Sequence, residues 1–145
     1  MDRRLLIQRV LMGTTALLLA PGILTSCEKT EFKPVDQSPK GPDIKTDIII
    51  DLSLGDNSVL NNNGGSKIVS GIIVVNTASS GFVALAASCT HEGAQINFSS
   101  KSNNLQCPSH GSVFSLTGSV ITGPAAIALK SYKVSRSGNI LTITE

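Results

Sequence analysis

The sequence is poor in aromatic residues, since its 145 positions hold four Phe, one Tyr and no Trp. Proteins that bind single-stranded nucleic acids use aromatic side chains as stacking platforms for the bases. This scarcity therefore argues against that class of partner. The apolar content comes mostly from Ile, Val, Leu and Ala, which is enough for a compact β core.

An excess of charge of one sign is also lacking, except at the N-terminus. The chain has 12 basic and 10 acidic residues. Arg3, Arg4 and Arg9 against Asp2 account for the surplus (3 − 1 = 2), so bases and acids balance from Cys27 onward. Without a basic stripe, nucleic acid is not expected as a partner.

The first 26 residues have the features of an export signal. Arg3-Arg4 precedes an apolar run over 11–24 that is too short for a spanning helix. Residues 24–27, Leu-Thr-Ser-Cys, resemble a bacterial lipobox. We therefore expect a signal peptide over 1–26, lipidation of Cys27 and membrane anchoring in the bacterial envelope. The arginine pair is compatible with twin-arginine export and equally with an ordinary positively charged signal start.

The rest of the chain divides into a linker and a β domain. Residues 27–45 are polar and rich in proline, which is typical of a tether. From residue 46 onward, short alternating apolar runs lie between turn residues, and no stretch has helical periodicity with caps. Strands are expected at 47–54, 67–76 with a bulge or a close backbone approach at Gly71, 82–87, 95–98, 105–106, 119–122, 127–134 and 139–144. This spacing predicts a small antiparallel sandwich or barrel over 46–145.

The two histidines and two of the three cysteines form two short motifs. Cys89 and His91 are separated by one residue, and Cys107 and His110 by two. Two thiolates and two imidazoles suit zinc or an iron–sulfur centre. Three interpretations remain open: a Cys89–Cys107 disulfide, a structural Cys₂His₂ zinc site, and a [2Fe–2S] centre with two Cys on one iron and two His on the other.

The region resembles the Rieske iron–sulfur family, whose pattern is Cys-x-His, about fifteen residues, and Cys-x-x-His. Further matches are Gly93, Pro108, Gly111-Ser112 and a proline loop at 123–125. The resemblance implies an all-β, Rieske-type antiparallel sandwich over 46–145 with a cluster-binding subdomain of two loops.

The resemblance also implies one [2Fe–2S] cluster per chain and assigns its ligands. Cys89 and Cys107 would hold the buried iron, and His91 and His110 the outer one. Ser112 matches the family's hydroxyl donor, which stabilises the reduced cluster.

A one-electron transfer protein with redox-protein partners is the function that the resemblance implies, and no substrate turnover is expected from this chain alone. The runner-up is the Rieske subunit of a quinol–cytochrome or arsenite-oxidase-like complex. A structural zinc-binding lipoprotein is the alternative from another class.

Four positions depart from the high-potential members of the family. Ala94 and Ser109 stand where those members have a disulfide between the cluster loops, and Phe114 stands where they have a Tyr hydroxyl. Glu92 adds a charge beside His91, which disfavours a dry quinone pocket. We therefore expect a midpoint potential below that of the quinol-oxidising members.

Overall fold

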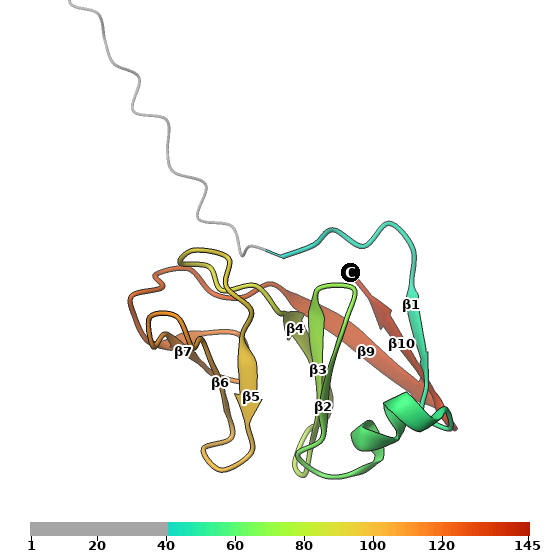
Figure 1. Cartoon of the computed structure of the whole chain (residues 1–145). Helices are drawn as coiled ribbons and strands as arrows, with labels where there is room; N and C mark the ends of the chain where they lie inside the picture. Colours follow the sequence, from blue (N-terminus) through green and yellow to red (C-terminus); the bar gives the residue numbers. More distant parts are fainter. Residues whose placement is uncertain (1–40) are drawn as a thin grey trace, which may run out of the picture. The chain divides into compact units, whose positions relative to one another are not determined.

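The computed structural model describes residues 41–145, so the signal peptide, Cys27 and most of the expected linker lie outside the described residues. The described part forms two antiparallel sheets (Figure 1). The base sheet has six strands in the order β1-β10-β9-β4-β3-β2, and the cluster sheet has four in the order β5-β6-β7-β8. The all-β antiparallel fold expected from the sequence is thereby confirmed.

The strands are short, and a 3₁₀ helix of seven residues interrupts them early in the domain. In chain order the elements are β1 (Ile48–Asp51), η1 (Gly55–Asn61), β2 (Ser66–Val69), β3 (Ile72–Thr77), β4 (Gly81–Ala86), β5 (Asn97–Ser99), β6 (Asn104–Gln106), β7 (Val113–Phe114), β8 (Val120–Thr122), β9 (Ser131–Ser137) and β10 (Ile140–Thr144). Within residues 41–145, no helix has the length and apolar character needed to cross a bilayer.

The central strands β3 and β4 divide their side chains between two hydrophobic cores. Ile73 and Leu85 pack in the core that also contains residues of the cluster sheet. Ile72 and Ala84, one position away, pack in the core under β1 and β10. Successive side chains of a strand point to opposite faces, and this alternation continues beyond β4. It places Cys89 in the same core as Leu85.

The prediction of one strand over 67–76 is wrong, because this segment forms two strands, β2 and β3, that pair as a hairpin. Ser70 and Gly71 both have positive φ, at 51° and 78°, and form the turn between them. Two consecutive residues of positive φ match the turn that suits the right-handed twist of paired strands. Gly71 is therefore a turn residue and not a bulge.

The expected strand 47–54 also ends early, at Asp51. The Asp51 carboxylate accepts hydrogen bonds from the backbone N–H and the hydroxyl of Ser53, at 2.9 and 2.6 Å, which turns the chain. The helix η1 follows, and sequence analysis missed it because Leu60 alone among its residues is buried. A helix with one buried residue has no apolar periodicity to detect.

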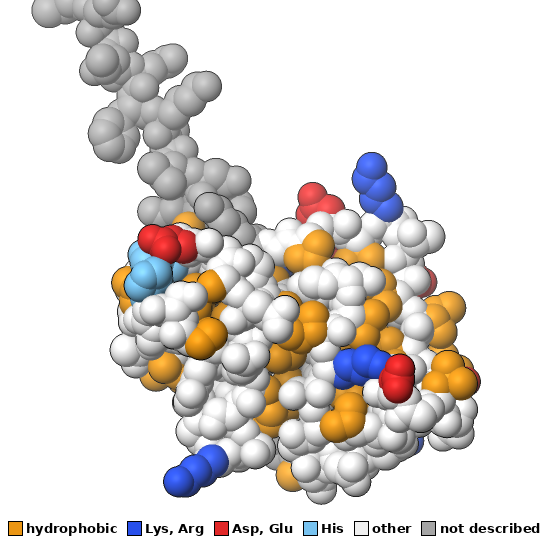
Figure 2. Space-filling view, in the orientation of Figure 1, with side chains coloured by type: hydrophobic (Ala, Val, Ile, Leu, Met, Phe, Trp, Pro, Cys, Tyr) orange, Lys and Arg blue, Asp and Glu red, His pale blue; other side chains and the backbone are white. Residues whose placement is uncertain are grey.

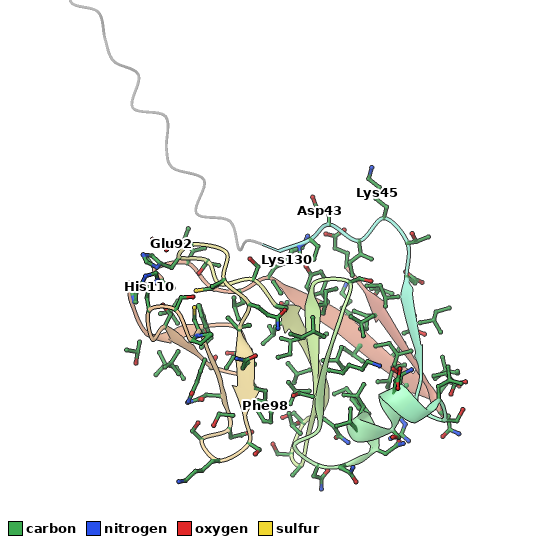
Figure 3. All side chains as sticks on the ribbon, in the orientation of Figure 1. Asp43, Lys45, Glu92, Phe98, His110 and Lys130 are labelled. Carbon is green, nitrogen blue, oxygen red and sulfur yellow. The ribbon has the colours of Figure 1, made fainter. Side chains whose placement is uncertain are left out.

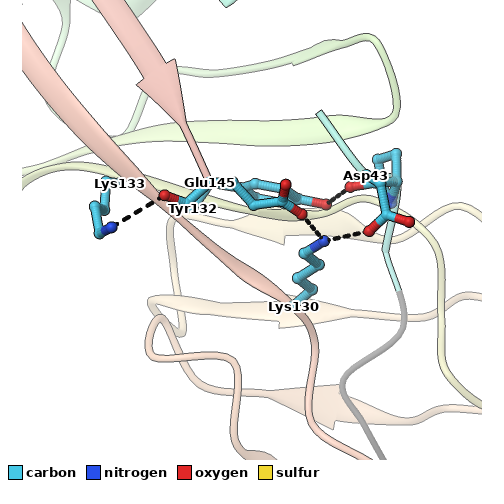
Figure 4. Close-up of polar contacts among 6 residues, drawn as sticks. Asp43, Lys130, Tyr132, Lys133 and Glu145 are labelled. Carbon is cyan, nitrogen blue, oxygen red and sulfur yellow. Dashed lines mark hydrogen bonds and ion pairs between the residues drawn. The ribbon is translucent and has the colours of Figure 1, made fainter. Parts of the chain in front are cut away.

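Residues 41–45, expected as the end of the linker, lie against the base sheet and are here called the strap (Figure 4). The Tyr132 hydroxyl donates to the Pro42 carbonyl at 2.6 Å. Lys130 pairs with Asp43 at 2.6 Å and also with Glu145. A methyl group added at Gly41 would lie 2.7 Å from the Tyr132 oxygen, so this approach requires glycine.

Candidate metal centre

Two loops of matching construction carry the predicted ligands. In the first, Cys89 N–H donates to the Ala94 carbonyl at 2.7 Å, and Gly93 N–H donates to the Cys89 carbonyl at 2.8 Å. In the second, Cys107 N–H donates to the Ser112 carbonyl at 2.8 Å, and Gly111 N–H donates to the Cys107 carbonyl at 3.1 Å.

Each loop thus closes on itself five residues after its cysteine. Gly93 and Gly111 both have positive φ, at 79° and 75°, a conformation that glycine adopts without strain. The two loops therefore need a glycine four residues after the cysteine, whereas the histidine can occupy either the second or the third position after it. This explains why the loops are alike although the spacing of their ligands differs.

The two thiols lie together in the buried part of the site, and both are free, so the disulfide alternative does not describe this structure. Burial raises the pKa of Cys89, although hydrogen bonding from the His91 backbone N–H and the Ser112 hydroxyl acts to lower that pKa. Burial also raises the pKa of Cys107. Hydrogen bonding from the Cys89 thiol and from the backbone N–H groups of Ser109 and His110 outweighs burial, so the pKa of Cys107 is lowered overall. Donors aimed at both sulfurs suit anionic thiolates.

The two imidazoles lie at the exposed edge of the same site. The rings of His91 and His110 meet edge to face, with their centroids 4.9 Å apart. Figure 2 shows an acidic side chain beside the histidines, and Figure 3 shows Glu92 next to His110. The Glu92 carboxylate is within 4.0 Å of a nitrogen of each ring. Buried sulfur on one side and exposed nitrogen on the other form a donor set with two chemically distinct halves.

A third loop, residues 123–127, closes over the two ligand loops. The buried Ser112 hydroxyl accepts a hydrogen bond from Ala125 N–H at 3.0 Å. The Thr90 hydroxyl donates to the Ile127 carbonyl at 2.6 Å. Each ligand loop is therefore tied to the third loop by one hydroxyl. Because the Ser112 oxygen accepts a hydrogen bond from Ala125 N–H, its own O–H is free to donate to the sulfur of Cys89.

The structure brings together all five residues that the sequence singled out for the site, namely Cys89, His91, Cys107, His110 and Ser112. Sequence analysis missed Thr90, whose partner is 37 residues away in the chain. It also treated Ser109 only as the position of an absent disulfide. Hydrogen bonding from the Ser109 backbone N–H and side chain lowers the pKa of Cys107.

Comparison with known proteins decides the family. The profile of the Rieske [2Fe-2S] domain matches residues 51–133, which include both ligand loops. The chain belongs to the Rieske [2Fe-2S] family. Its cofactor is accordingly one [2Fe–2S] cluster, and one-electron transfer is the chemistry of its Rieske domain. The residues present fit that group, because two buried thiols and two adjoining imidazoles converge from two loops.

Two relatives are iron-sulfur subunits of cytochrome b6-f complexes. The subunit from Chlorobaculum tepidum is 30% identical over 137 residues, 92% of this chain and 70% of the relative. That from Chlorobaculum thiosulfatiphilum is 38% identical over 74 residues, 51% of this chain and 40% of the relative. The chain therefore spans less than half of the length of this second Rieske relative.

Solved structures agree with the Rieske fold. The plasma membrane Rieske protein PetC3 from Synechocystis PCC 6803 is 32% identical, with a TM-score of 0.50, and the match covers 55% of this chain and 84% of that one. The ferredoxin of carbazole 1,9a-dioxygenase from Nocardioides aromaticivorans has the same TM-score at 23% identity, covering 59% of this chain and 91% of that one. This second likeness concerns the fold alone.

Proposed function

We propose that this Rieske protein carries electrons in the bacterial cell envelope, through a cluster held by Cys89, His91, Cys107 and His110. The convergence of these four side chains from two matching loops is the observation that carries the proposal. The cysteines would hold the inner iron and the histidines would hold the outer one. When bound, the cluster accepts and releases one electron.

The exposed histidine edge is the docking face for redox partners in this proposal. Cys89 and Cys107 are each only 3% exposed, so an electron has the shortest route to the surface through the exposed rings. His91 and His110 are 31% and 46% exposed at their side chains. The loop at 123–127 excludes water from the sulfur side, because hydroxyl groups tie it to both ligand loops.

The midpoint potential lies below that of the quinol-oxidising members. Hydrogen bonds to the sulfurs raise the potential of an iron–sulfur centre. Phe114 is fully buried in the core next to the site and has no hydroxyl to donate. Ala94 and Ser109 leave the two ligand loops without a covalent link.

The protein is anchored to the membrane through a lipid on Cys27, after export by a signal peptide over residues 1–26. The support for this anchor is the Leu24-Thr25-Ser26-Cys27 motif behind an apolar run. Export of a folded protein through the twin-arginine route would carry the cluster across intact. The partners are redox proteins, and nucleic acid is not among them.

The deciding experiment is metal analysis of the purified protein with electron paramagnetic resonance and potentiometry of its reduced state. We expect two irons and two labile sulfides per chain and the signal of a reduced Rieske centre. The potential should fall in the lower part of the range of Rieske centres, roughly −150 to +300 mV. A colourless, zinc-loaded protein without this signal would establish the zinc alternative, and a potential at the top of the range would refute the low-potential assignment.

A second candidate is the Rieske subunit of a quinol–cytochrome complex. The relatives that are cytochrome b6-f subunits favour it, one of them over 92% of this chain. The variant Cys27→Ser separates the two candidates. If lipidation anchors the protein, Cys27→Ser is released from membranes into the soluble fraction. If it stays in the membrane fraction and co-purifies with a cytochrome, the subunit candidate is correct.

A further inference from the structure

The Glu92 carboxylate lies beside both histidine rings at the exposed edge of the site, and Figure 3 shows it next to His110. One carboxylate oxygen is 3.6 Å from Nδ1 of His110, and the other is 4.0 Å from Nε2 of His91. A single negative charge therefore contacts both proposed ligands of the outer iron, although these come from different loops.

This charge has no cationic neighbour among the described residues. No Lys or Arg nitrogen of residues 41–145 lies within 4.0 Å of Glu92. Lys130 lies away from the histidine edge in Figure 3 and forms ion pairs with Asp43 and Glu145. The field of Glu92 at the histidines is consequently not cancelled by an adjacent positive charge.

The loop holds Glu92 at this position. Gly93, the next residue, turns the chain with positive φ. Its N–H donates to the Cys89 carbonyl at 2.8 Å, and its carbonyl accepts from the Ser88 hydroxyl at 3.2 Å. The backbone on the C-terminal side of Glu92 is therefore fixed, while its side chain is 62% exposed and reaches the rings through solvent.

We propose that Glu92 is a tuning residue that lowers the midpoint potential of the cluster. The inference rests on the proposed function, since it takes His91 and His110 as ligands of the outer iron. Reduction adds one electron to the cluster, and no bond forms or breaks in the protein. A negative charge beside both ligands disfavours the arrival of that electron, so Glu92 stabilises the oxidised state relative to the reduced one.

The test compares Glu92→Gln with Asp47→Asn by potentiometry at one fixed pH and low ionic strength. Both variants remove one exposed carboxylate, but Asp47 immediately precedes β1, a strand of the base sheet. We expect Glu92→Gln to favour the reduced state about fivefold, a rise of about 40 mV, because tenfold corresponds to about 59 mV for one electron. Asp47→Asn should stay within a quarter of that shift.

Two further variants test whether charge is the cause. Glu92→Lys should raise the potential by about twice the shift of Glu92→Gln, because it changes the charge by two. Glu92→Asp keeps the charge and should stay close to the native potential. In about 1 M salt the gap between Glu92→Gln and the native protein should shrink, because exposed charges are screened over about 3 Å.

The outcomes separate this inference from the proposed function. If the native protein gives no Rieske signal, the proposed function fails first. If every variant carries the signal but Glu92→Gln shifts no more than Asp47→Asn, the inference is overturned and the proposed function stands. If Glu92→Gln loses the cluster or alters its reduced-state spectrum, Glu92 helps to build the site and does not act through its charge, which also overturns the inference.

Discussion

The base sheet and the cluster sheet of this Rieske protein are held together in different ways. In the base sheet, β3 and β4 are six residues long and pair along their whole length, with apolar side chains on both faces. In the cluster sheet no strand exceeds three residues and β7 has only two. The cluster sheet thus has few backbone hydrogen bonds between its strands.

In the cluster sheet, hydrogen bonds of the loops take the place of long paired strands. The ligand loops at the edge of the cluster sheet each close through two backbone hydrogen bonds, and Ser112 and Thr90 tie them to the loop at 123–127. Metal binding adds folding free energy to a site whose ligands come from separate loops. We therefore expect the base sheet to be stable by packing and the cluster sheet to depend on its hydrogen bonds and its cluster.

Removing one proposed ligand should produce the largest effect and should destabilise the cluster sheet while leaving the base sheet folded. We expect Cys107→Ser to lose both irons and the reduced-state paramagnetic signal, because serine replaces a thiolate that the inner iron requires. Amide hydrogen exchange should then rise over 97–122 and stay slow in β3, β4, β9 and β10. The control Cys27→Ser should keep both irons, and retention of the signal in Cys107→Ser would contradict the assigned ligand.

Matched core truncations should sharpen the comparison. Leu141 and Leu105 are both fully buried, the first in the base core and the second beside Cys107. Each Leu→Ala change should cost about 2–5 kcal/mol in the free energy of unfolding, measured by denaturant titration. Leu105→Ala should also speed loss of the cluster, measured as bleaching in a chelator, whereas Leu141→Ala should not. Equal bleaching rates would show that the two cores act as one unit.

The sequence was sufficient to single out the proposed ligands, because the rarest residues of the chain fall into two motifs whose spacing is specific. It was not sufficient for what supports them. Thr90 reaches the Ile127 carbonyl across 37 residues, and nothing local distinguishes a threonine that makes such a contact from one that does not. The same holds for Glu92, whose contact with His110 depends on how two loops meet.

The fold was predictable in class because alternating apolar residues indicate strands, but its details were not. One glycine in an apolar run is compatible with a bulge and with a turn, and the positive φ of Ser70 decides between them. Likewise, alternation extended the first strand to residue 54, although Leu54 is 59% exposed. A hydrogen bond to the Asp51 side chain ends that strand, and hydrophobic periodicity carries no information about it.

Deleting single hydroxyls should separate the support of the loops from the tuning of the cluster. Ser112→Ala leaves the Ala125 N–H without its acceptor, which should cost about 1–3 kcal/mol. It also removes the donor to the Cys89 sulfur, so the midpoint potential should fall. Thr90→Val should cost about 1 kcal/mol and leave the potential unchanged, because the partner of Thr90 is a carbonyl. Denaturant unfolding measures the stability cost and potentiometry measures the midpoint potential of each variant. Equal potentials in the two variants would exclude Ser112 as a donor.

The smallest expected effect concerns the strap on the base sheet, where a surface ion pair adds to packing. The hydrogen bond and the charge of Lys130 hold the pKa of Asp43 below its ordinary value (Figure 4). A lowered folded-state pKa means that this contribution is complete above the ordinary carboxyl pKa and is lost as pH falls through the lower folded value.

Amide exchange over residues 41–47 should therefore accelerate in acid, after correction for the intrinsic rate. Lys130→Met should raise it about threefold at neutral pH, since exposed ion pairs contribute little, and should remove its acid dependence. Lys133→Met is the matched control, because Lys133 donates only to the backbone carbonyl of Glu145, at 3.1 Å. If both variants behave alike, the Tyr132–Pro42 hydrogen bond and the close fit of Gly41 hold the strap without the ion pair. The strap would then be attached to the base sheet by one hydrogen bond and by packing, with no contribution from charge.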